Sequence, residues 1–198
     1  GGDAPPPPFP SLESLTLSHL ECPPQTVALA ARACGATLRR LNVQGCINLD
    51  DDALRAIGEQ APSLTDLRFG PARVVSDAGV AAVAEAVGGT LKELHFYVCK
   101  RAGGAALEAV ARHCTALTAL DVRGTLAAST GIAALAGAPC APHLRTLLLS
   151  ASRGCRGVSR DALLALVGAC GALEELDLYN LRNADVAVAA AALRRCPS

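Results

Sequence analysis

A leucine phrase that returns at almost constant spacing constrains this chain more than any other feature. Its form is L-x-x-L-x-L, with Val or Phe also taking the third position, and its first leucine recurs after 26, 26, 27, 26, 27 and 29 residues. The seven copies begin at Leu12, Leu38, Leu64, Leu91, Leu117, Leu144 and Leu173. A repeat of roughly 20 to 50 residues is typical of a solenoid, in which each unit buries its apolar face against its neighbours. The spacing therefore predicts a repeat array and favours binding over catalysis.

Each unit has two halves with different hydrophobic periods. The leucine phrase alternates apolar and polar residues, as a short half-buried strand does. The second half has helical spacing, for example at Leu54, Ile57 and Ala61. Short polar residues typical of helix starts precede these halves at Asp51 or Asp52, Ser76-Asp77, Ser129-Thr130, Ser159-Arg160-Asp161 and Asn183-Ala184-Asp185. Glycines after the helical halves, at Gly35, Gly88-Gly89 and Gly171, predict left-handed helix ends.

Strand–helix units stacked in register give a parallel sheet on one side and helices on the other. Because a helix is about 10 Å wide and neighbouring strands lie about 4.8 Å apart, we expect an arc or horseshoe with the sheet concave and the helices convex. Residues 11–198 should form this single α/β domain of about seven repeats. Residues 1–10 should be a proline-rich linker or an incomplete preceding unit, and we expect the chain to be a fragment of a longer protein. The longer sixth unit, with 152–157, predicts a loop at one rim.

Charge and composition exclude several classes of partner. Lys plus Arg and Asp plus Glu number 18 each, so the chain has no net field that would attract nucleic acid or an acidic membrane surface. No stretch approaches the roughly 20 apolar residues of a membrane-spanning helix. With no Trp, three Phe and two Tyr, the core should consist of Leu, Val and Ala.

The nine cysteines follow the repeat and indicate packing. Two of them, Cys46 and Cys99, lie at the turn that leaves the strand, and others end the helical half at Cys34, Cys114, Cys170 and Cys196. A buried thiol in such a column behaves as a small hydrophobic group. The sequence contains no C-x-x-C pair, so we expect no metal site. Reduced cysteines indicate a cytoplasmic or nuclear location.

The segment from Leu38 to Cys46, followed by Asp51 or Asp52, Leu54 and Ile57, carries a family resemblance. Together with the copy from Leu91 to Cys99 and Cys114, it resembles the cysteine-containing class of leucine-rich repeat over residues 9 to 198. The resemblance implies a right-handed, ribonuclease-inhibitor-like arc. The departures from the pattern are Ala72, Thr125, Ser152 and Leu181 in place of the turn cysteine, and a proline-rich lead where an F-box would stand.

The best-known members of this class are F-box proteins, in which the repeats hold the target and the F-box binds a Skp-type adaptor. The resemblance thus implies a protein-recognition module, the substrate-receptor part of an SCF-type ubiquitin ligase that directs proteasomal degradation. A Skp-type adaptor and a cullin would bind through an F-box outside this sequence. The alternative is a non-catalytic scaffold in a cytoskeletal or ciliary assembly, which would place the protein in the axoneme.

Outward residues of the strands should line the concave face in three columns. Both tyrosines, Tyr97 and Tyr179, fall in the third column, three units or about 14 Å apart at strand spacing. Tyr and Arg are enriched among interface hot spots. The candidate partner-binding residues are Tyr97, Tyr179, His95, Arg123, Leu148, Arg40, Arg68, Asp121 and Asp177. Within this set Leu148 should be an exposed apolar residue, and Arg40 and Arg68 should read acidic groups. The alternative is that these residues form no binding patch and belong to an ordinary solvated sheet face.

Motifs of catalysis do not occur in the sequence. It has no G-x-S-x-G, G-x-x-x-x-G-K-[ST] or H-E-x-x-H. Asp66, Glu93 and His95 should neighbour one another across strands, but an open concavity lacks the desolvation that tunes catalytic pKa values. We therefore expect no enzyme activity and no cofactor, and a monomeric module whose partner is another protein.

Overall fold

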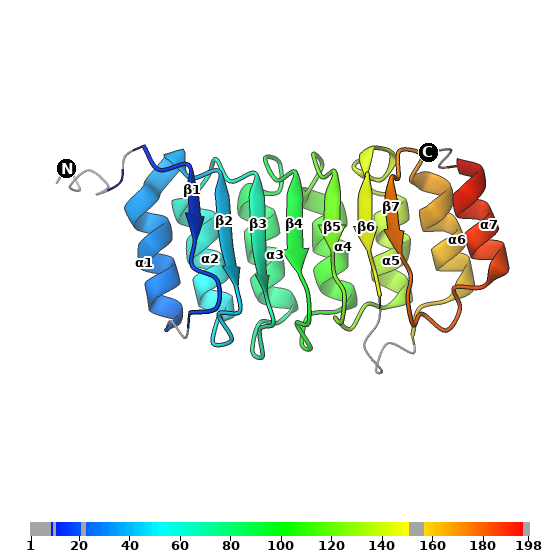
Figure 1. The fold of residues 1–198 in the computed structure, drawn as a ribbon, viewed down its shortest axis with the longest axis horizontal. Helices are drawn as coiled ribbons and strands as arrows, with labels where there is room; N and C mark the ends of the chain where they lie inside the picture. The colour runs from blue at the N-terminus through cyan, green and yellow to red at the C-terminus, as the bar shows by residue number, and fades with distance from the viewer. Residues whose placement is uncertain (1–8, 10, 21–22, 151–156, 196–198) are drawn as a thin grey trace.

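A computed structural model of the chain describes residues 9, 11–20, 23–150 and 157–195. Within them, seven parallel strands form one open sheet in chain order, and the helices cover one of its two faces (Figure 1). The strands are β1 (Ser14–Thr16), β2 (Arg40–Gln44), β3 (Asp66–Gly70), β4 (Glu93–Phe96), β5 (Ala119–Asp121), β6 (Thr146–Leu148) and β7 (Glu175–Asp177). The leucine-rich-repeat solenoid predicted from the spacing is confirmed.

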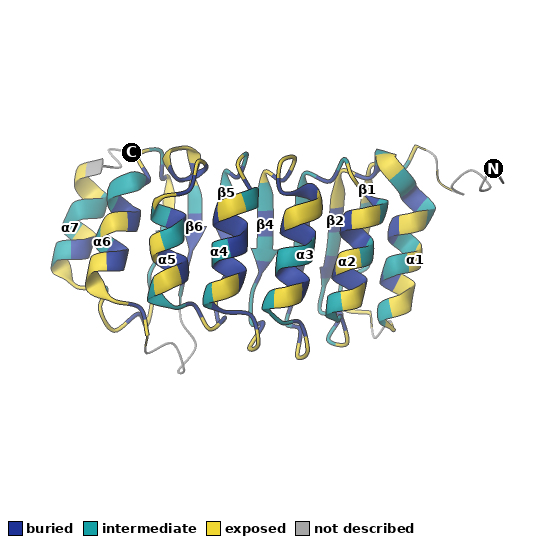
Figure 2. Cartoon of the chain, turned by 180° about the vertical axis from the view of Figure 1, so that it is seen from behind, coloured by how far each residue is buried: buried dark blue, intermediate teal, exposed yellow. Residues whose placement is uncertain are grey.

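Each strand is followed by the helix of its unit. The helices are α1 (Pro24–Cys34), α2 (Asp51–Gln60), α3 (Asp77–Val87), α4 (Gly104–His113), α5 (Ser129–Ala136), α6 (Arg160–Ala169) and α7 (Val186–Arg195). Short 3-10 turns η1 (Gly35–Thr37) and η2 (Ala141–His143) lead back to β2 and β6. Seen from behind, each helix turns a buried stripe towards the sheet and an exposed stripe outwards (Figure 2). Among the described residues, no helix combines the length and the apolar character that crossing a membrane requires.

The core is one continuous apolar layer between the sheet and the helices. The middle leucines of the central units, Leu67, Leu94 and Leu120, are fully buried there. Phe69 and Phe96 are also fully buried, and their rings stack with centroids 5.8 Å apart. The expectation of a core of Leu, Val and Ala was therefore incomplete, because two of the three phenylalanines occupy the third position of the leucine phrase in adjacent units.

The cysteines with described positions pack as the spacing predicts. Cys34, Cys46, Cys99, Cys114, Cys140 and Cys170 are buried and form no disulfide. Burial raises the pKa of the Cys99 and Cys114 thiols to about 12, so both stay protonated at neutral pH. Where Thr125 replaces the turn cysteine, its hydroxyl donates to the Val122 carbonyl at 2.8 Å. Cys196, the 1–8 lead and the 151–156 part of the expected rim loop lie outside the described residues.

Helix starts agree with the sequence prediction in most units. Ser76 and Ser159 cap α3 and α6, with each hydroxyl accepting from a backbone N–H of the first turn. Asp50, one residue before the expected pair, caps α2 by accepting from Ala53 N at 2.8 Å. Ser129 is different, since its hydroxyl accepts from Ser159 N and donates to Gly157 O of the next unit.

The prediction of left-handed helix ends was largely wrong. Gly35 has a φ of 58°, but Gly88 is helical at −57°. Positive φ recurs instead in the turn that leaves the strand, seven residues after the first leucine, at His19, Gly45, Val98, Gly124 and Asn180. The chain must reverse sharply there to pass from the strand to the helical half, and one left-handed residue makes that turn.

A carboxylate at the start of one helix caps the next helix in the array. Asp77, the first residue of α3, accepts from Gly103 N at 2.7 Å and from Ala106 N at 2.9 Å at the start of α4. The N-cap residue of α4 is Gly103, which has no side chain to do this. The carboxylate of one unit thus supplies the N-terminal cap for the helix of the following unit.

Replacing Asp77 with alanine should therefore lower the free energy of unfolding by about 1–2 kcal/mol, the usual cost of removing an N-cap. Chemical denaturation of the two proteins measures the difference. Asp161→Ala is the matched control, because Asp161 is an exposed acid in the first turn of α6 and its loss should cost about 0.5 kcal/mol. Equal losses in the two variants would show that Asp77 acts only through the helix dipole.

Candidate functional site

The register of the sheet confirms the predicted columns on the face opposite the helices, which we call the sheet face. The first two columns, read from β1 to β7, are Ser14, Arg40, Asp66, Glu93, Ala119, Thr146, Glu175 and Thr16, Asn42, Arg68, His95, Asp121, Leu148, Asp177. Tyr97 directly follows β4, whereas Arg123 and Tyr179 lie two residues after β5 and β7. A strand has a period of two and the units have nearly equal length, so the candidate residues within the strands lie in the columns expected for them.

Six charged or titratable side chains on and just after β3, β4 and β5 lie in one continuous chain of contacts, with ion pairs at both ends and His95 between them. This charge ladder consists of Asp66, Arg68, Glu93, His95, Asp121 and Arg123. Arg68 donates to both carboxylate oxygens of Asp66, at 3.0 and 3.1 Å, and to Glu93 at 2.6 Å. Arg123 donates in the same way to both oxygens of Asp121, at 2.9 and 2.7 Å. These hydrogen bonds raise the pKa of both guanidinium groups, and they hold the ladder in one arrangement.

His95 joins the two halves of the ladder. Its Nε2 lies 3.7 Å from a Glu93 oxygen, and its Nδ1 lies 3.8 Å from an Asp121 oxygen. The side chain is only 14% exposed, and its Nε2 is a buried atom without a hydrogen-bond partner among the described residues. Both ring nitrogens therefore face a carboxylate at a distance that a small shift would close to a hydrogen bond.

Asp121 is the most buried acid of the sheet face, with 2% of its surface exposed. Burial alone would raise the pKa of its carboxyl group. The opposing interactions with His95 and with the guanidinium and backbone N–H of Arg123 are stronger together, and the pKa falls to about 2. Asp121 is thus a permanent anion at neutral pH.

Second-column Asn and Asp side chains also shape the end of the strand. Asn42, Asp121 and Asp177 each accept a hydrogen bond from the backbone N–H two residues further on, at 3.0, 3.1 and 2.9 Å. This local bond is the usual turn-forming role of Asn and Asp. Two of the candidate binding residues, Asp121 and Asp177, therefore have a structural role that their residue type could have suggested.

Two of the candidates are less accessible than the sequence suggested. Leu148 was expected to be exposed, but it is 9% exposed, and Asp121 is buried as described above. Leu148 lies on the sheet face between Asp121 and Asp177 in register, outside the main core layer. Alternation predicts the face on which a residue lies, whereas its exposure depends on how far the neighbouring side chains cover it.

The exposed candidates lie at the ends of the face and along its third column. Tyr179 is 78% exposed, Arg40 and Arg123 are exposed, and Tyr97 is half-buried. Gly70 precedes Tyr97 in this column and has a φ of 102°. A Cβ on Gly70 would clash with the backbone carbonyl oxygen of Tyr97. Only glycine permits this close approach of β3 and β4, and it leaves one flank of Tyr97 without a neighbouring side chain.

A groove of about 160 Å³ opens on the sheet face over β1, β2 and β3. Its polar lining consists of Ser14, Thr16, Arg40, Asn42, Asp66 and Arg68. Sequence reasoning selected the two arginines but not the hydroxyl and amide side chains, which carry no signal until the register brings them together.

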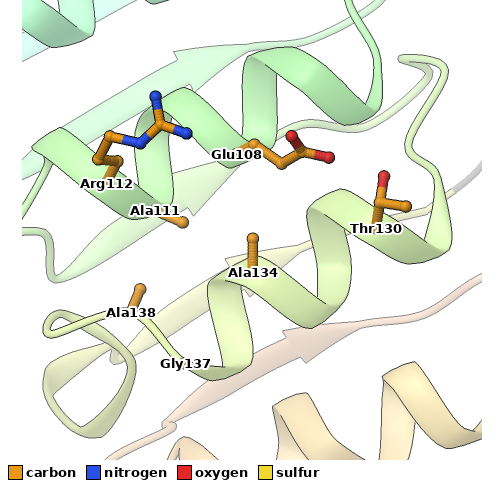
Figure 3. Close-up of a pocket in the computed structure, with 7 residues that line it drawn as sticks. All are labelled: Glu108, Ala111, Arg112, Thr130, Ala134, Gly137 and Ala138. Atoms are coloured by element: carbon orange, nitrogen blue, oxygen red, sulfur yellow. The ribbon is translucent and has the colours of Figure 1, made fainter.

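A second groove, of about 470 Å³, lies on the helix face between α4 and α5 (Figure 3). The two helices pack closely at the start of α5, where a Cβ on Gly131 would lie 2.7 Å from the Gly104 carbonyl oxygen. α5 then ends at Ala136, after eight residues, whereas α4 has ten. The last turn of α4, with Ala111 and Arg112, consequently has only Gly137 and Ala138 beside it. The groove follows from the short helix and is shallow, and its wall includes Ala111, Ala134 and Ala138.

No group of three or more His, Cys, Asp or Glu side chains among the described residues is arranged to hold a metal ion. The charge ladder alternates acids with arginines, and each carboxylate of the pairs already accepts from a guanidinium group. Its geometry suits the recognition of charged and hydrogen-bonding groups.

Comparison with known proteins supports the fold. No family model matches the chain. Among solved structures, a chain in the crystal structure of the yeast Rad7 and Elc1 complex is similar, with a TM-score of 0.53 and 16% sequence identity. The alignment covers 96% of this chain and 62% of that chain, so this chain spans less than two thirds of the similar protein's length. At this identity the likeness shows a shared repeat fold.

Proposed function

We propose that this chain is a protein-recognition module that binds a protein partner on the sheet face. The observation that carries the proposal is the charge ladder, which holds acids and bases in fixed positions across β3, β4 and β5. Side chains that are already ordered lose little conformational entropy when a partner binds. A fixed pattern of charge also favours a complementary partner over others.

Binding without catalysis fits the state of the titratable groups. A general acid or base works best with a pKa near the operating pH. The pKa of Asp121 lies at about 2, and Arg123 neutralises its charge. We propose that the module acts through shape and charge; a monomeric module without a cofactor stays the expectation from the sequence.

The finer proposal is a substrate receptor of an SCF-type ubiquitin ligase. Its support is the resemblance of the repeats to the cysteine-containing class found in F-box proteins, together with the buried cysteine columns. A protein of similar fold occurs in a two-protein complex, that of Rad7 and Elc1. A Skp-type adaptor and a cullin would bind outside the repeats, and the buried thiols suit a cytoplasmic or nuclear protein.

Affinity capture of the natural gene product from its source cells tests both the proposed recognition module and the proposed ligase role. The test variant carries Tyr97→Ala and Tyr179→Ala, and the matched control carries Val186→Ala and Leu193→Ala, two exposed apolar residues of α7. We expect one protein to fall at least tenfold in the tyrosine variant only, because Tyr side chains are frequent hot spots. An adaptor and a cullin should be recovered equally with all three proteins.

The experiment can rule out the binding surface and the ligase role separately. Capture that is identical for the tyrosine variant and the α7 variant would rule out the sheet face as the binding surface. A tyrosine-dependent partner without adaptor or cullin would rule out the ligase role and leave a recognition module. Recovery of cytoskeletal or axonemal proteins alone would support the scaffold alternative.

A further inference from the structure

We propose that the groove over β1, β2 and β3 is a subsite for one carboxylate side chain, Asp or Glu, of the bound partner. This inference rests on the proposed function, because it names the chemistry that part of the sheet face recognises. It concerns the β1 end of the sheet face, where Asp66 and Arg68 of the charge ladder form one wall of the groove.

The groove gathers hydrogen-bond donors from β1 and β2. Ser14 and Thr16 supply hydroxyl groups from β1, and Arg40 and Asn42 supply a guanidinium and an amide from β2. Asn42 Oδ1 already accepts from Gln44 N at 3.0 Å, which leaves the amide NH₂ group to donate. A group that accepts several hydrogen bonds and carries a negative charge matches this lining.

Arg40 differs from the other arginines of the sheet face because its charge is not neutralised. Arg68 and Arg123 each donate to both oxygens of an acid. The acid beside Arg40 in register is Asp66, and Arg68 already binds it. Arg40 has no side-chain hydrogen bond or ion pair within the described part of the chain, and it is exposed. Its planar guanidinium group is suited to bidentate binding of a carboxylate.

Charge balance favours a carboxylate over a phosphoryl group. The charged side chains that line the groove are Arg40, Arg68 and Asp66, so the lining itself carries one net positive charge. A carboxylate carries one negative charge, whereas a phosphoryl group carries about −1.5 to −2 at neutral pH. The additional charge would lie beside Asp66, which forms part of the groove wall.

Among the residues that the structure describes, the rest of the sheet face offers a carboxylate no comparable place. Arg123 is paired with Asp121, and the far end of the face carries the acids Glu175 and Asp177. An acidic side chain there would be repelled, since like charges in proximity are destabilising. A partner should therefore lie in one direction across the array, with its acidic residue over β1–β3.

A phage-displayed library of random dodecapeptides, selected on the intact chain, provides the probe. Peptides eluted from the wild-type protein should share an Asp or Glu at one position. The selected peptide is then synthesised in three forms, with Glu, Gln or phosphoserine at that position, and measured by calorimetry against the wild type and two variants. Arg40→Gln removes the proposed contact. Arg39→Gln is the matched control, because Arg39 is the adjacent exposed arginine outside the groove.

We expect the Glu peptide to bind Arg40→Gln at least tenfold more weakly than wild type, and Arg39→Gln within about twofold. Glu-to-Gln in the peptide should weaken binding to Arg40→Gln much less than it weakens binding to wild type, because two groups in contact are non-additive in a double-mutant cycle. The phosphoserine form should bind wild type at least tenfold more weakly than the Glu form. Equal or tighter phosphoserine binding would overturn the choice of a carboxylate.

The remaining outcomes separate this inference from the proposed function. Peptides that lose affinity in the Tyr97→Ala, Tyr179→Ala variant but not in Arg40→Gln would overturn the subsite and leave the sheet face as the binding surface. Peptides whose affinity is unchanged in every sheet-face variant would overturn both the carboxylate subsite and the sheet face as the binding surface. Failure to select any peptide would overturn the subsite as well, since an accessible Arg40 groove should bind an acidic side chain in some sequence context.

Discussion

Replacing Phe96 with alanine should lower the free energy of unfolding by about 3–5 kcal/mol, the usual range for deleting a buried aromatic ring. Phe96 is fully buried and stacks on Phe69 of the preceding unit, with ring centroids 5.8 Å apart. Each unit of a solenoid packs only against its neighbours, so a cavity between the third and fourth units weakens the array at its middle. Urea denaturation followed by circular dichroism measures the change.

The Phe69–Phe96 contact itself is isolated by a double-mutant cycle. With Phe69→Ala and the double variant included, we expect a coupling energy of about 0.5–1.5 kcal/mol, as for other aromatic pairs. Strictly additive losses would mean that the rings contribute only through the volume they fill. Leu15→Ala is the control, because Leu15 is a half-buried residue of β1 at the end of the array and its loss should be smaller.

Asparagine in place of Asp121 should remove about 2 kcal/mol of stability at pH 7 and flatten the acid side of the stability profile. The carboxyl group has a pKa of about 2 in the folded chain, against a reference value of 3.8. Because the folded pKa is the lower one, the stabilisation is complete above the unfolded pKa and is lost as the pH falls through the folded value. Wild-type stability should therefore decline between about pH 5 and pH 2 more steeply than that of the variant.

Denaturation at a series of pH values, with the wild type and Asp121→Asn in parallel, checks this prediction. Asp52→Asn is the control, since Asp52 forms an exposed ion pair with Arg55 on the same helix. Such surface pairs contribute about 0.5 kcal/mol or less. Parallel acid profiles for wild type and Asp121→Asn would show that the Asp121 pair does not account for the acid sensitivity.

The candidate site was predictable in position but not in detail. Arg68 and His95 lie side by side in the column that the leucine spacing assigns to them, because strand alternation and a constant repeat are both properties of the sequence. Leu148 shows the limit of this reasoning. Alternation placed it correctly on the sheet face, yet the side chains around it leave it 9% exposed.

The sequence also did not predict which charged side chains form ion pairs with one another. Arg40 and Arg68 had the same predicted role, but Arg68 binds Asp66 and Glu93, and Arg40 remains unpaired in the described part of the chain. The distinction depends on the direction that each guanidinium group takes among several acids within reach. Asp77 is a similar case, because its position marks the start of α3 while its carboxylate caps α4.

The repeat, the parallel strand order, the sheet and helix faces and the columns of the outward strand residues were predictable from the sequence. These features follow from local periodicity repeated at an interval of 26 to 29 residues. The accessibility of the outward residues, the neutralisation of the charges and the capping of one unit by another became clear only in the folded chain. Some of these contacts join neighbouring units about 25 to 30 residues apart along the chain, as Arg68 does with Glu93, and others join residues two apart, as Arg68 does with Asp66. In both cases side-chain reach and rotamer, and not the repeat pattern, select the contact.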